Sequence, residues 1–594
     1  MTEFVPLLLL VSFTLLIRTR SPLAAPASAG ASGLRVAAAT LGFAAALAAC
    51  LWVVTGRVPL SLPILALFLA LPGPLRPRPR MPEWRALQGR VPVVVCGVVG
   101  GLVVAYVWGS ARPAAVVHDE AAYVLQSSIF ASGRWTAPGR PLPDFFEQLH
   151  VFVTPFLASK YPPGHSLLLV PGAWLGMPAL VPILLNALSG ALIFAHARRI
   201  AGGPVALVTF LLWTSAPGTF WYRASYLSEN TTLALWLVGL WALRRWLDGG
   251  GRAWIAVLAL CVGWGAITRP MTMFALTVPI AFVFLRRVLA RGAWRELGIA
   301  VGGGGLCLLL LPVWNAGTTG DWRLSPYRQY STVYFPYEWT GFGVRPDPPL
   351  RPVPEAFAPF EAQYRRLHAE HTVAALPDTA LRRAYTIGLN QWSGGREGLG
   401  LFAILGALDF GKEAAFALVS AVCLFVGYLF FAHNPAWTPY YLELQPLLSF
   451  ATALGLCGAA ASVLQALPAR APSGERRGGW RSMGIAAMGA LLLVVSIADV
   501  VEARERRRNE LALQTRFETK VRELPSKAIV FVRYTPVSSV NSSFVQNPPD
   551  LAAAPVWVVH DLGSRDSELA GLAPDRRLYL YDDTRGSLRP FSTR

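Results

Sequence analysis

The sequence predicts an all-α polytopic membrane protein of about 13–14 transmembrane helices, with large extracytoplasmic loops and a small C-terminal α/β domain. Of its 594 residues, 54% are hydrophobic and only 15% are charged, and the mean hydropathy is +0.44. Apolar runs of membrane-spanning length recur along the chain, and basic residues cluster in alternate loops between them. So low a charged fraction excludes an ordinary soluble enzyme, a disordered protein and a disulfide scaffold.

The apolar runs define the individual helices. The predicted spans lie at residues 4–17, 34–54, 58–75, 91–109, 179–196, 203–219, 230–243, 253–268, 271–285, 297–314, 397–410, 414–432, 441–466 and 483–499. The first run, Phe4 to Ile17, has no basic segment before it, so we interpret it as a span and not as a cleaved signal peptide. The run Gly302–Gly305 lies inside a predicted span, where small residues allow close helix packing.

The charge distribution predicts the orientation. The formal net charge is +19, but the basic residues sit in every second loop, as the positive-inside rule requires, so we do not expect a nucleic-acid partner. The short intervening loops hold at most one arginine each. This alternation places both termini outside the cytoplasm. The six cysteines all lie in apolar runs, which argues against a disulfide framework or a zinc site.

The chain divides into three parts. Residues 1–90 carry extra N-terminal transmembrane helices, and residues 91–499 form the main membrane module, with outer loops at 110–178 and 315–396. Residues 500–594 form the small extracytoplasmic domain, in which a helical stretch near 502–523 precedes three β-type runs at 528–534, 555–560 and 577–581. Large outer loops indicate chemistry or recognition at the outer face.

The first outer loop carries the most informative residues. Asp119 and Glu120 follow closely on a predicted span, where they could simply begin a helix, or could act as a general base or bind a metal. Lys160 precedes Tyr161 and an apolar run at 166–176 that is too short to cross the membrane. This lysine could snorkel at the interface or bind a lipid phosphate.

Later outer segments add further candidates. Arg223 and Arg269 are lone arginines at outer helix ends, and Glu229 begins a span, where it could cap the helix or face a cavity. Tyr440 and Tyr441 lie at an outer boundary, where they fit an aromatic belt or a surface that stacks a sugar or lipid head.

Several motifs together resemble the polytopic GT-C glycosyltransferases. They are an Asp-Glu pair in the first outer loop, the segment YPPGHSLLLVPGAWLGMPALVPILLNAL, SYLSENT, Arg-Pro at 269–270, TGDWRLSPYRQY, GFG and the short α/β tail. The chain is most similar to the protein O-mannosyltransferase and aminoarabinose-transferase groups, the bacterial subgroup of glycosyltransferase family 39. The resemblance covers roughly residues 91–594. The chain departs from the pattern in its first three spans and in having Pro439-Tyr440-Tyr441 where a His-Tyr pair is expected.

The resemblance implies transfer of a sugar from a polyprenyl-phosphate donor at the outer face of a bacterial plasma membrane, to an acceptor that is a lipid, a glycan or a protein. Asp119 would be the catalytic base, supported by Glu120, and Lys160, Arg269 and Arg223 would bind the donor phosphate. The expected substrate-lining residues are Tyr123, Tyr161, Glu229, Tyr440 and Tyr441. No cofactor is implied with certainty, and a divalent cation stays open.

Three other functions compete with this one. A transporter or flippase of lipid-linked glycans would place polar residues along its helices at midplane depth. A non-catalytic membrane assembly protein would keep the fold and tolerate the loss of Asp119. A polysaccharide polymerase or ligase of another membrane fold would centre its chemistry on arginines and histidines in a late loop, and loop 315–396 contains both.

Overall fold

The computed structural model of the chain describes residues 84–344, 348–466, 478–525, 527–534 and 544–592. The predicted spans at 4–17, 34–54 and 58–75, and both chain ends, lie outside these residues. Every predicted span after residue 90 falls on helical residues. The prediction of a mostly helical fold with a small C-terminal sheet is therefore confirmed.

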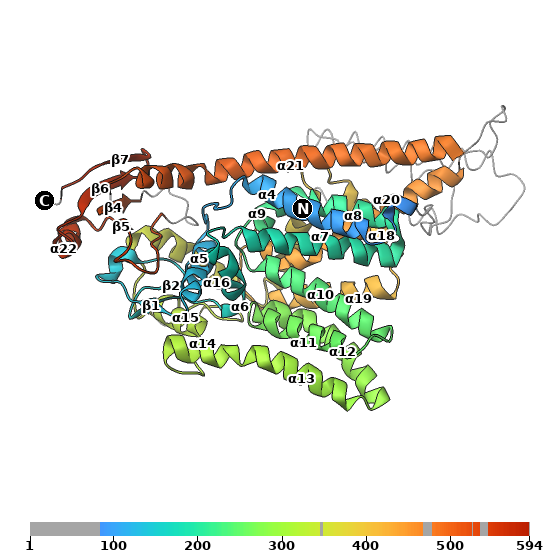
Figure 1. Cartoon of the computed structure of the whole chain (residues 1–594), viewed down its shortest axis with the longest axis horizontal. Coiled ribbons are helices and arrows are strands. Elements are labelled where there is room, and N and C mark those ends of the chain that lie inside the picture. Colours follow the sequence, from blue (N-terminus) through green and yellow to red (C-terminus); the bar gives the residue numbers. More distant parts are fainter. Residues whose placement is uncertain (1–83, 345–347, 467–477, 526, 535–543, 593–594) are drawn as a thin grey trace, which may run out of the picture.

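Long helices lie side by side and form a bundle (Figure 1). They are α4 (Val91–Trp108), α7 (Leu180–Ala201), α8 (Gly203–Thr214), α10 (Glu229–Leu247), α11 (Ala253–Ala266), α12 (Pro270–Arg291), α13 (Trp294–Leu308), α14 (Leu310–Thr319), α18 (Leu399–Ala407), α19 (Lys412–Tyr428), α20 (Gln445–Ala466) and α21 (Gly478–Arg522).

Several of these helices have the length and composition of membrane spans. Among the described residues, five helical stretches are long and apolar enough to cross, or six if α18 and α19, which meet at a bend of 116°, count as one span. The helices α8 and α11 are apolar but shorter. The chain is a multi-pass membrane protein. Side chains such as Trp213, Trp236 and Phe284 fill the bundle's core.

The glycine run in α13 packs as the sequence predicts. A β-carbon on Gly263 of α11 would lie 2.9 Å from the carbonyl oxygen of Gly304, and one on Gly303 would lie 3.1 Å from the β-carbon of Ala259. The two helices can approach this closely only because these positions lack side chains. Gly302 and Gly305 face open space.

Two of the predicted outer loops form structured layers at one end of the bundle (Figure 1). The first holds α5 (His118–Ala131), β1 (Ala137–Pro138), η2 (Pro143–Phe146), β2 (Val151–Phe152), β3 (Phe156–Ser159) and α6 (Pro163–Trp174), with strand order β1-β3-β2. The second holds α15 (Pro326–Tyr334), η4 (Glu355–Phe357), α16 (Ala358–Glu370) and α17 (Leu376–Trp392). Short elements between the spans are η1 (Arg85–Leu87), η3 (Pro217–Thr219), α9 (Phe220–Arg223) and η5 (Pro439–Leu444).

The tail forms the small sheet that the three β-type runs predict. The strands are β4 (Ala528–Arg533), β5 (Val556–His560), β6 (Arg577–Asp582) and β7 (Ser587–Pro590), in the order β5-β4-β6-β7. The central strand β4 is parallel to β5 and β6, and β7 is a fourth, antiparallel strand that the sequence pattern does not predict. The helical elements η6 (Gly563–Arg565) and α22 (Asp566–Leu572) follow β5.

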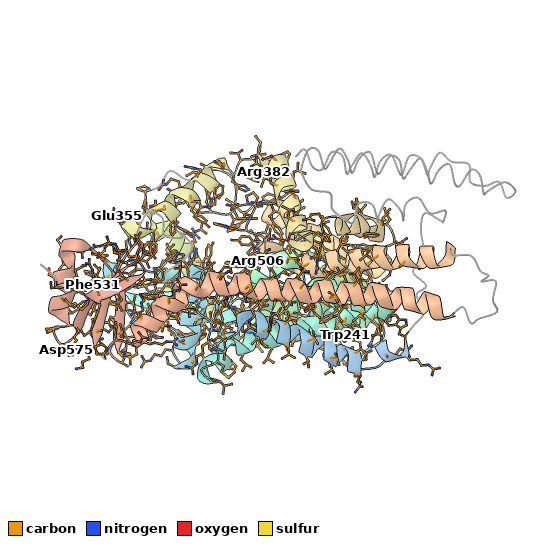
Figure 2. The ribbon with its side chains drawn as sticks, turned by 90° about the horizontal axis from the view of Figure 1, so that it is seen from above. Trp241, Glu355, Arg382, Arg506, Phe531 and Asp575 are labelled. Atoms are coloured by element: carbon orange, nitrogen blue, oxygen red, sulfur yellow. The ribbon has the colours of Figure 1, made fainter. Side chains whose placement is uncertain are left out.

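Both faces of the tail sheet are covered. Val530 and Val532 of β4 pack against Phe517 of α21, whereas Ile529 and Phe531 pack against Phe145 of the first outer loop and its neighbours. The strand β4 is therefore buried on both faces, and its continuous apolar run is typical of a central parallel strand. In the view from above, α21 runs along the bundle toward the sheet that carries Phe531 (Figure 2). The tail is thus joined to the membrane helices and packed on an outer loop.

Candidate active site

The acidic pair of the first outer loop lies in the first turn of α5. Negative side chains at this position interact favourably with the helix dipole. Successive residues on a helix point about 100° apart, so the two carboxylates diverge. The side chain of Asp119 is 42% exposed, whereas that of Glu120 is only 1% exposed.

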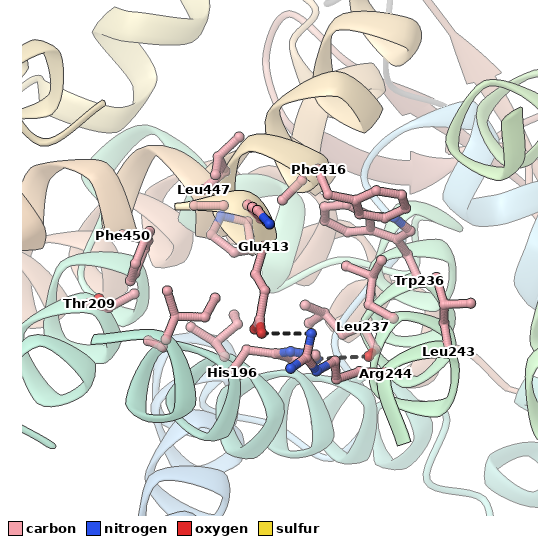
Figure 3. A pocket seen from close by; sticks show the side chains of 18 of the residues that line it. His196, Thr209, Trp236, Leu237, Leu243, Arg244, Glu413, Phe416, Leu447 and Phe450 are labelled. Carbon is pink, nitrogen blue, oxygen red and sulfur yellow. Dashed lines mark hydrogen bonds and ion pairs between the residues drawn. The ribbon is translucent and has the colours of Figure 1, made fainter. Parts of the chain in front are cut away.

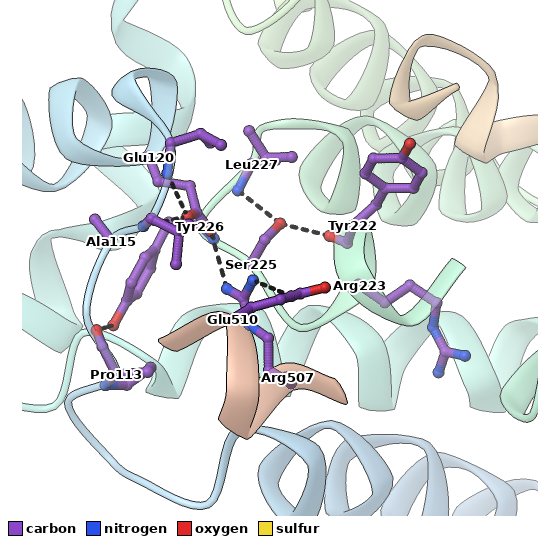
Figure 4. A network of polar contacts seen from close by, with 12 residues as sticks. Pro113, Ala115, Glu120, Tyr222, Arg223, Ser225, Tyr226, Leu227, Arg507 and Glu510 are labelled. Carbon is purple, nitrogen blue, oxygen red and sulfur yellow. Dashed lines mark hydrogen bonds and ion pairs between the residues drawn. The ribbon is translucent and has the colours of Figure 1, made fainter. Parts of the chain in front are cut away.

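Glu120 lies in a polar network with Tyr226 and Arg507 (Figure 4). Its carboxylate accepts hydrogen bonds from the backbone N–H groups of Val116 at 2.8 Å and Tyr226 at 3.0 Å. It also lies 3.6 Å from Nη2 of Arg507 in α21. Glu120 thus binds backbone at the start of α5 and does not line the cavity that Asp119 lines.

Asp119 lines a cavity of about 1270 Å³ at the end of the bundle where the loops gather. Both outer loops, several helix ends and the tail contribute to its wall. Of the predicted site residues, the cavity brings together Asp119, Tyr123, Lys160, Tyr161, Glu229, Arg269 and Tyr440. Residues from five separate stretches of the sequence thus meet in one space of a size that accepts a large ligand.

Two side chains support Asp119 directly. The hydroxyl of Tyr161 donates a hydrogen bond to Oδ1 of Asp119 at 2.5 Å, and Nε2 of His150 lies 3.8 Å from Oδ2. The ring of Tyr161 stacks on that of Tyr123, with centroids 4.7 Å apart. Burial, followed by the nearby charge of Lys160, lowers the pKa of His150 well below its usual value. The imidazole is therefore neutral at pH 7.

Lys160 is buried beside a glutamate that the sequence analysis does not single out. Its Nζ lies 3.7 Å from Oε2 of Glu338 and 4.5 Å from the ring centre of Tyr327. The hydroxyl groups of Tyr327 and Tyr364 donate to Glu338 at 2.5 and 3.0 Å. Burial alone would raise the pKa of Glu338, but the charge of Lys160 and the hydrogen bond from Tyr327 lower it below its usual value. The pair places a fixed cation at the cavity wall.

Arg269 is the second cation of the wall. Its Nη1 lies 2.6 Å from Oε1 of Glu229, and its Nη2 donates to the hydroxyl of Tyr428 at 2.9 Å. Its guanidinium also lies 5.3 Å from the ring centre of Tyr440. The remaining nitrogen, Nε, donates to Thr272 at 3.2 Å. These contacts hold the guanidinium in one orientation with 13% of the side chain exposed.

The Pro-Pro-Gly segment brings Lys160 and Arg269 into the same region. The backbone N–H of Gly164 donates to the carbonyl of Ile267 at 2.9 Å. A β-carbon at Gly164 would lie 2.5 Å from Oγ1 of Thr268, so only glycine fits here. The contact packs the start of α6 against the residues directly before Arg269.

Besides Glu120, two more predicted site residues, Arg223 and Tyr441, lie outside the cavity wall. The guanidinium of Arg223 lies 3.9 Å from the ring centre of Trp213 and donates to Oδ1 of Asn186 at 3.1 Å. The hydroxyl of Tyr441 bonds to Nε2 of His433 at 3.0 Å. Both side chains are fully buried. Their positions argue against the predicted roles in phosphate binding and substrate lining, because neither reaches the cavity.

The cavity wall also contains residues that the sequence analysis does not predict. Among them are His118, His150, Tyr327, Tyr364 and Tyr428, and from α21 and the tail Glu510, Gln514, Asp583 and Thr584. No spacing pattern links these positions. The only signal is the dense tyrosine content of 327–337. Among the described residues, no group of three or more His, Cys, Asp and Glu side chains is arranged to hold a metal ion.

A second, smaller cavity of about 290 Å³ lies between α7, α10, α19 and α20 (Figure 3). Its walls are mainly apolar. Nη1 of Arg244 lies 2.8 Å from Oε1 of Glu413 at this cavity. Because Glu229 begins α10 and Arg244 lies near its end, the glutamate at the large cavity and the arginine at the small one are about 22 Å apart along the helix.

Comparison with known proteins relates part of the chain to a family. The family model for dolichyl-phosphate-mannose-protein mannosyltransferases matches residues 176–315. This match confirms, over that segment, the resemblance to polytopic GT-C glycosyltransferases. No curated protein is similar enough in sequence to match the chain.

Solved structures show distant similarity. ArnT from Cupriavidus metallidurans bound to undecaprenyl phosphate is 16% identical, with a TM-score of 0.44 over 84% of this chain and 94% of that chain. The same protein in the apo state is 16% identical, with a TM-score of 0.45 over 83% and 94%. The arabinofuranosyltransferase AftD from Mycobacteria is 15% identical, with a TM-score of 0.39 over 84% and 35%.

Proposed function

We propose that this protein is a membrane glycosyltransferase that moves a sugar from a polyprenyl-phosphate donor to an acceptor at the outer face of a bacterial plasma membrane. The observation that carries the proposal is the large cavity, which joins a partly exposed carboxylate, Asp119, to two fixed cations, Lys160 and Arg269. The family match over residues 176–315 supports glycosyl transfer as the reaction class.

Asp119 is the proposed general base. A sugar hydroxyl is a weak nucleophile at neutral pH, so its proton must be removed as its oxygen attacks the anomeric carbon. The hydrogen bond from Tyr161 orients the carboxylate, and its 42% exposure leaves room for an acceptor hydroxyl. The neutral imidazole of His150 lies behind the carboxylate and is not a competing cation.

Lys160 and Arg269 are the proposed donor anchors. When the bond between the anomeric carbon and the phosphate oxygen breaks, negative charge develops on the polyprenyl phosphate. A guanidinium held in one orientation stabilises that charge without reorganisation. Glu229 and Glu338 balance the two cations before the donor arrives. A phosphate must therefore compete with these carboxylates for the cations.

The outer face is proposed because the alternation of basic loops places the large loops outside. Nucleotide sugars stay in the cytoplasm, so a site at the outer face needs a lipid-linked donor. Single cysteines introduced at Thr2 and Thr593 test the orientation. We expect an impermeant thiol reagent to label both in intact spheroplasts. Protection of either site from the reagent would overturn the proposed topology.

The activity is tested by transfer from a radiolabelled polyprenyl-phosphate sugar in membranes that contain the full chain. We expect label to leave the lipid and enter an acceptor of the cell envelope. Asp119→Asn should lose this transfer while polyprenyl-phosphate binding stays normal. Normal transfer by that variant would exclude Asp119 as the base. Flipping of the lipid without any transfer would favour a transporter.

A further inference from the structure

Part of the large cavity's wall comes from α21 and the tail. Glu510 and Gln514 lie one helical turn apart on α21, so both face the same way. Asp583 and Thr584 lie in the turn between β6 and β7. All four side chains line the same cavity as Asp119. We call the part of the wall formed by these four residues the tail wall.

The tail wall contains the types of side chain that bind sugars. Two carboxylates, an amide and a hydroxyl offer acceptors and donors for sugar hydroxyl groups. Trp221 of α9 lines the cavity next to them and contacts Glu510. An indole ring presents a flat apolar face to the C–H face of a sugar. The side chain of Glu510 is 39% exposed, so its carboxylate is accessible from the cavity.

The tail wall differs in charge from the wall that holds Lys160 and Arg269. The described residues of α21 and the tail that line the cavity include two carboxylates and no cation. Arg507 lies behind them, 3.4 Å from Glu510, but it is also 3.6 Å from Glu120 (Figure 4). The guanidinium of Arg507 is thus shared by Glu120 and Glu510 and offsets only one of their two negative charges.

Several contacts fix the tail wall relative to Asp119. Nη2 of Arg140 in the first outer loop donates to the carbonyl of Pro548 at 2.6 Å. Nε2 of His560 in β5 bonds to the carbonyl of Glu147 at 2.9 Å. A group held by the tail wall therefore meets the base at a set position, as a two-substrate reaction requires.

We infer that the tail wall is the acceptor subsite and that the acceptor is a neutral or cationic sugar, not an anionic one. The inference rests on the proposed function. The basic wall would take the phosphate of the donor, and the acidic tail wall would take the hydroxyl or amino groups of the acceptor. Because the described residues of the tail wall include no cation, a donor phosphate would find no charged partner there, and the substrates would not exchange places.

Binding of three disaccharides of matched size tests the inference on the purified full-length protein. The probes are diacetylchitobiose, which is neutral, chitobiose, which is cationic, and digalacturonate, which is anionic. We expect the first two to bind about tenfold more tightly than digalacturonate in titrations followed by saturation-transfer NMR. The double variant Glu510→Gln, Asp583→Asn should reduce this difference to about twofold.

Glu505→Gln is the matched control, since Glu505 lies on α21, pairs with Arg508 at 3.0 Å and does not line the cavity. It should bind all three probes like the parent. Equal or tighter binding of digalacturonate by the parent, unchanged discrimination by the double variant, or no binding of any probe would each overturn the inference. Binding of polyprenyl phosphate, measured on the same samples, separates this outcome from failure of the proposed donor site.

Discussion

The two cavities of the bundle share helices but differ in chemistry. The larger one, of about 1270 Å³, is lined by ionisable groups from the outer loops, the helix ends and the tail. The smaller one, of about 290 Å³, is lined mainly by apolar side chains, with one ion pair between Arg244 and Glu413 and with His196, Thr209 and Lys412 as further polar groups. The helix α10 contributes Glu229 to the first and Arg244 to the second.

The difference shows where this fold gathers polar groups. A cation with a glutamate partner occurs at both cavities, Arg269 with Glu229 and Arg244 with Glu413, so an ion pair alone does not mark a reactive site. What distinguishes the large cavity is the partly exposed Asp119 beside two such pairs. Substitutions at both cavities test whether this combination, and not charge alone, is required for activity.

The largest effect is expected at Asp119. Asp119→Asn removes the proposed base and should lower the transfer rate about 10²–10⁴-fold, while leaving expression and folding intact. Asp321→Asn is the control, because Asp321 is exposed and its carboxylate accepts the local backbone N–H of Arg323 at 2.9 Å. Transfer rates measured at saturating donor decide the matter, and similar rates in the two variants would contradict the assignment.

A matched pair of substitutions compares the two cavities directly. Arg269→Lys keeps the charge beside Glu229 but loses the fork that also reaches Thr272 and Tyr428. The KM for the donor should rise about tenfold, because a lysine cannot make the same planar contacts. Arg244→Lys makes the same exchange beside Glu413 and should change the KM less than twofold. Equal effects would show that both cavities serve the donor.

Glu120→Gln should have an intermediate effect. The amide weakens the contact with Arg507 and the hydrogen bonds that hold the start of α5, so Asp119 shifts without being removed. We expect kcat to fall about tenfold with the donor KM unchanged, and Glu120→Asp to recover part of the loss. A change in donor KM in place of kcat would place Glu120 at the phosphate.

The smallest effect concerns stability. Burial raises the pKa of Glu147 from its usual 4.5 to about 7, although Arg351 lies 2.6 Å away and opposes the rise. Between these values the folded chain keeps a proton that the unfolded chain has released, so the stability contributed by this group falls as the pH rises from about 4.5 to about 7. Glu147→Gln should flatten this loss.

Thermal midpoints at pH 5 and pH 8 measure the effect of Glu147→Gln. The parent should lose more stability than the variant over this interval. Glu361→Gln is the control, since Glu361 lies on α16 in the second outer loop and forms an ion pair with its helical neighbour Arg365 at 3.0 Å. An equal drop in the parent and the Glu147 variant would show that Glu147 does not titrate in this range.

The sequence predicts the helices well because their signal is local. Runs of apolar residues and alternating basic loops determine the spans, and strand-type runs determine three of the four strands of the tail. The close approach of Gly304 to Gly263 also follows from the glycine run. Of the site, the acidic pair, Lys160 and Arg269 are found because short motifs surround them.

The rest of the site depends on contacts between distant segments. Glu338 becomes the partner of Lys160 only when the second outer loop folds over the first, and no spacing in the sequence records that contact. The position of Arg223 is also hidden in the sequence. An arginine at an outer helix end is expected to be exposed, but the guanidinium of Arg223 packs on Trp213 inside the bundle. The sequence also does not distinguish the two adjacent carboxylates. In the helix α5 they point in different directions, so that Asp119 lines the cavity and Glu120 is buried.

The helix α21 has a further consequence for how the chain tolerates change. It is continuous over 45 residues, so at about 1.5 Å per residue it spans roughly 68 Å from the bundle to the tail sheet. Inserting one residue would turn everything beyond it by about 100° and carry Glu510 off the cavity. Helical phase therefore constrains the number of residues along α21, independently of which residues they are, and insertions there should be less well tolerated than in the loops.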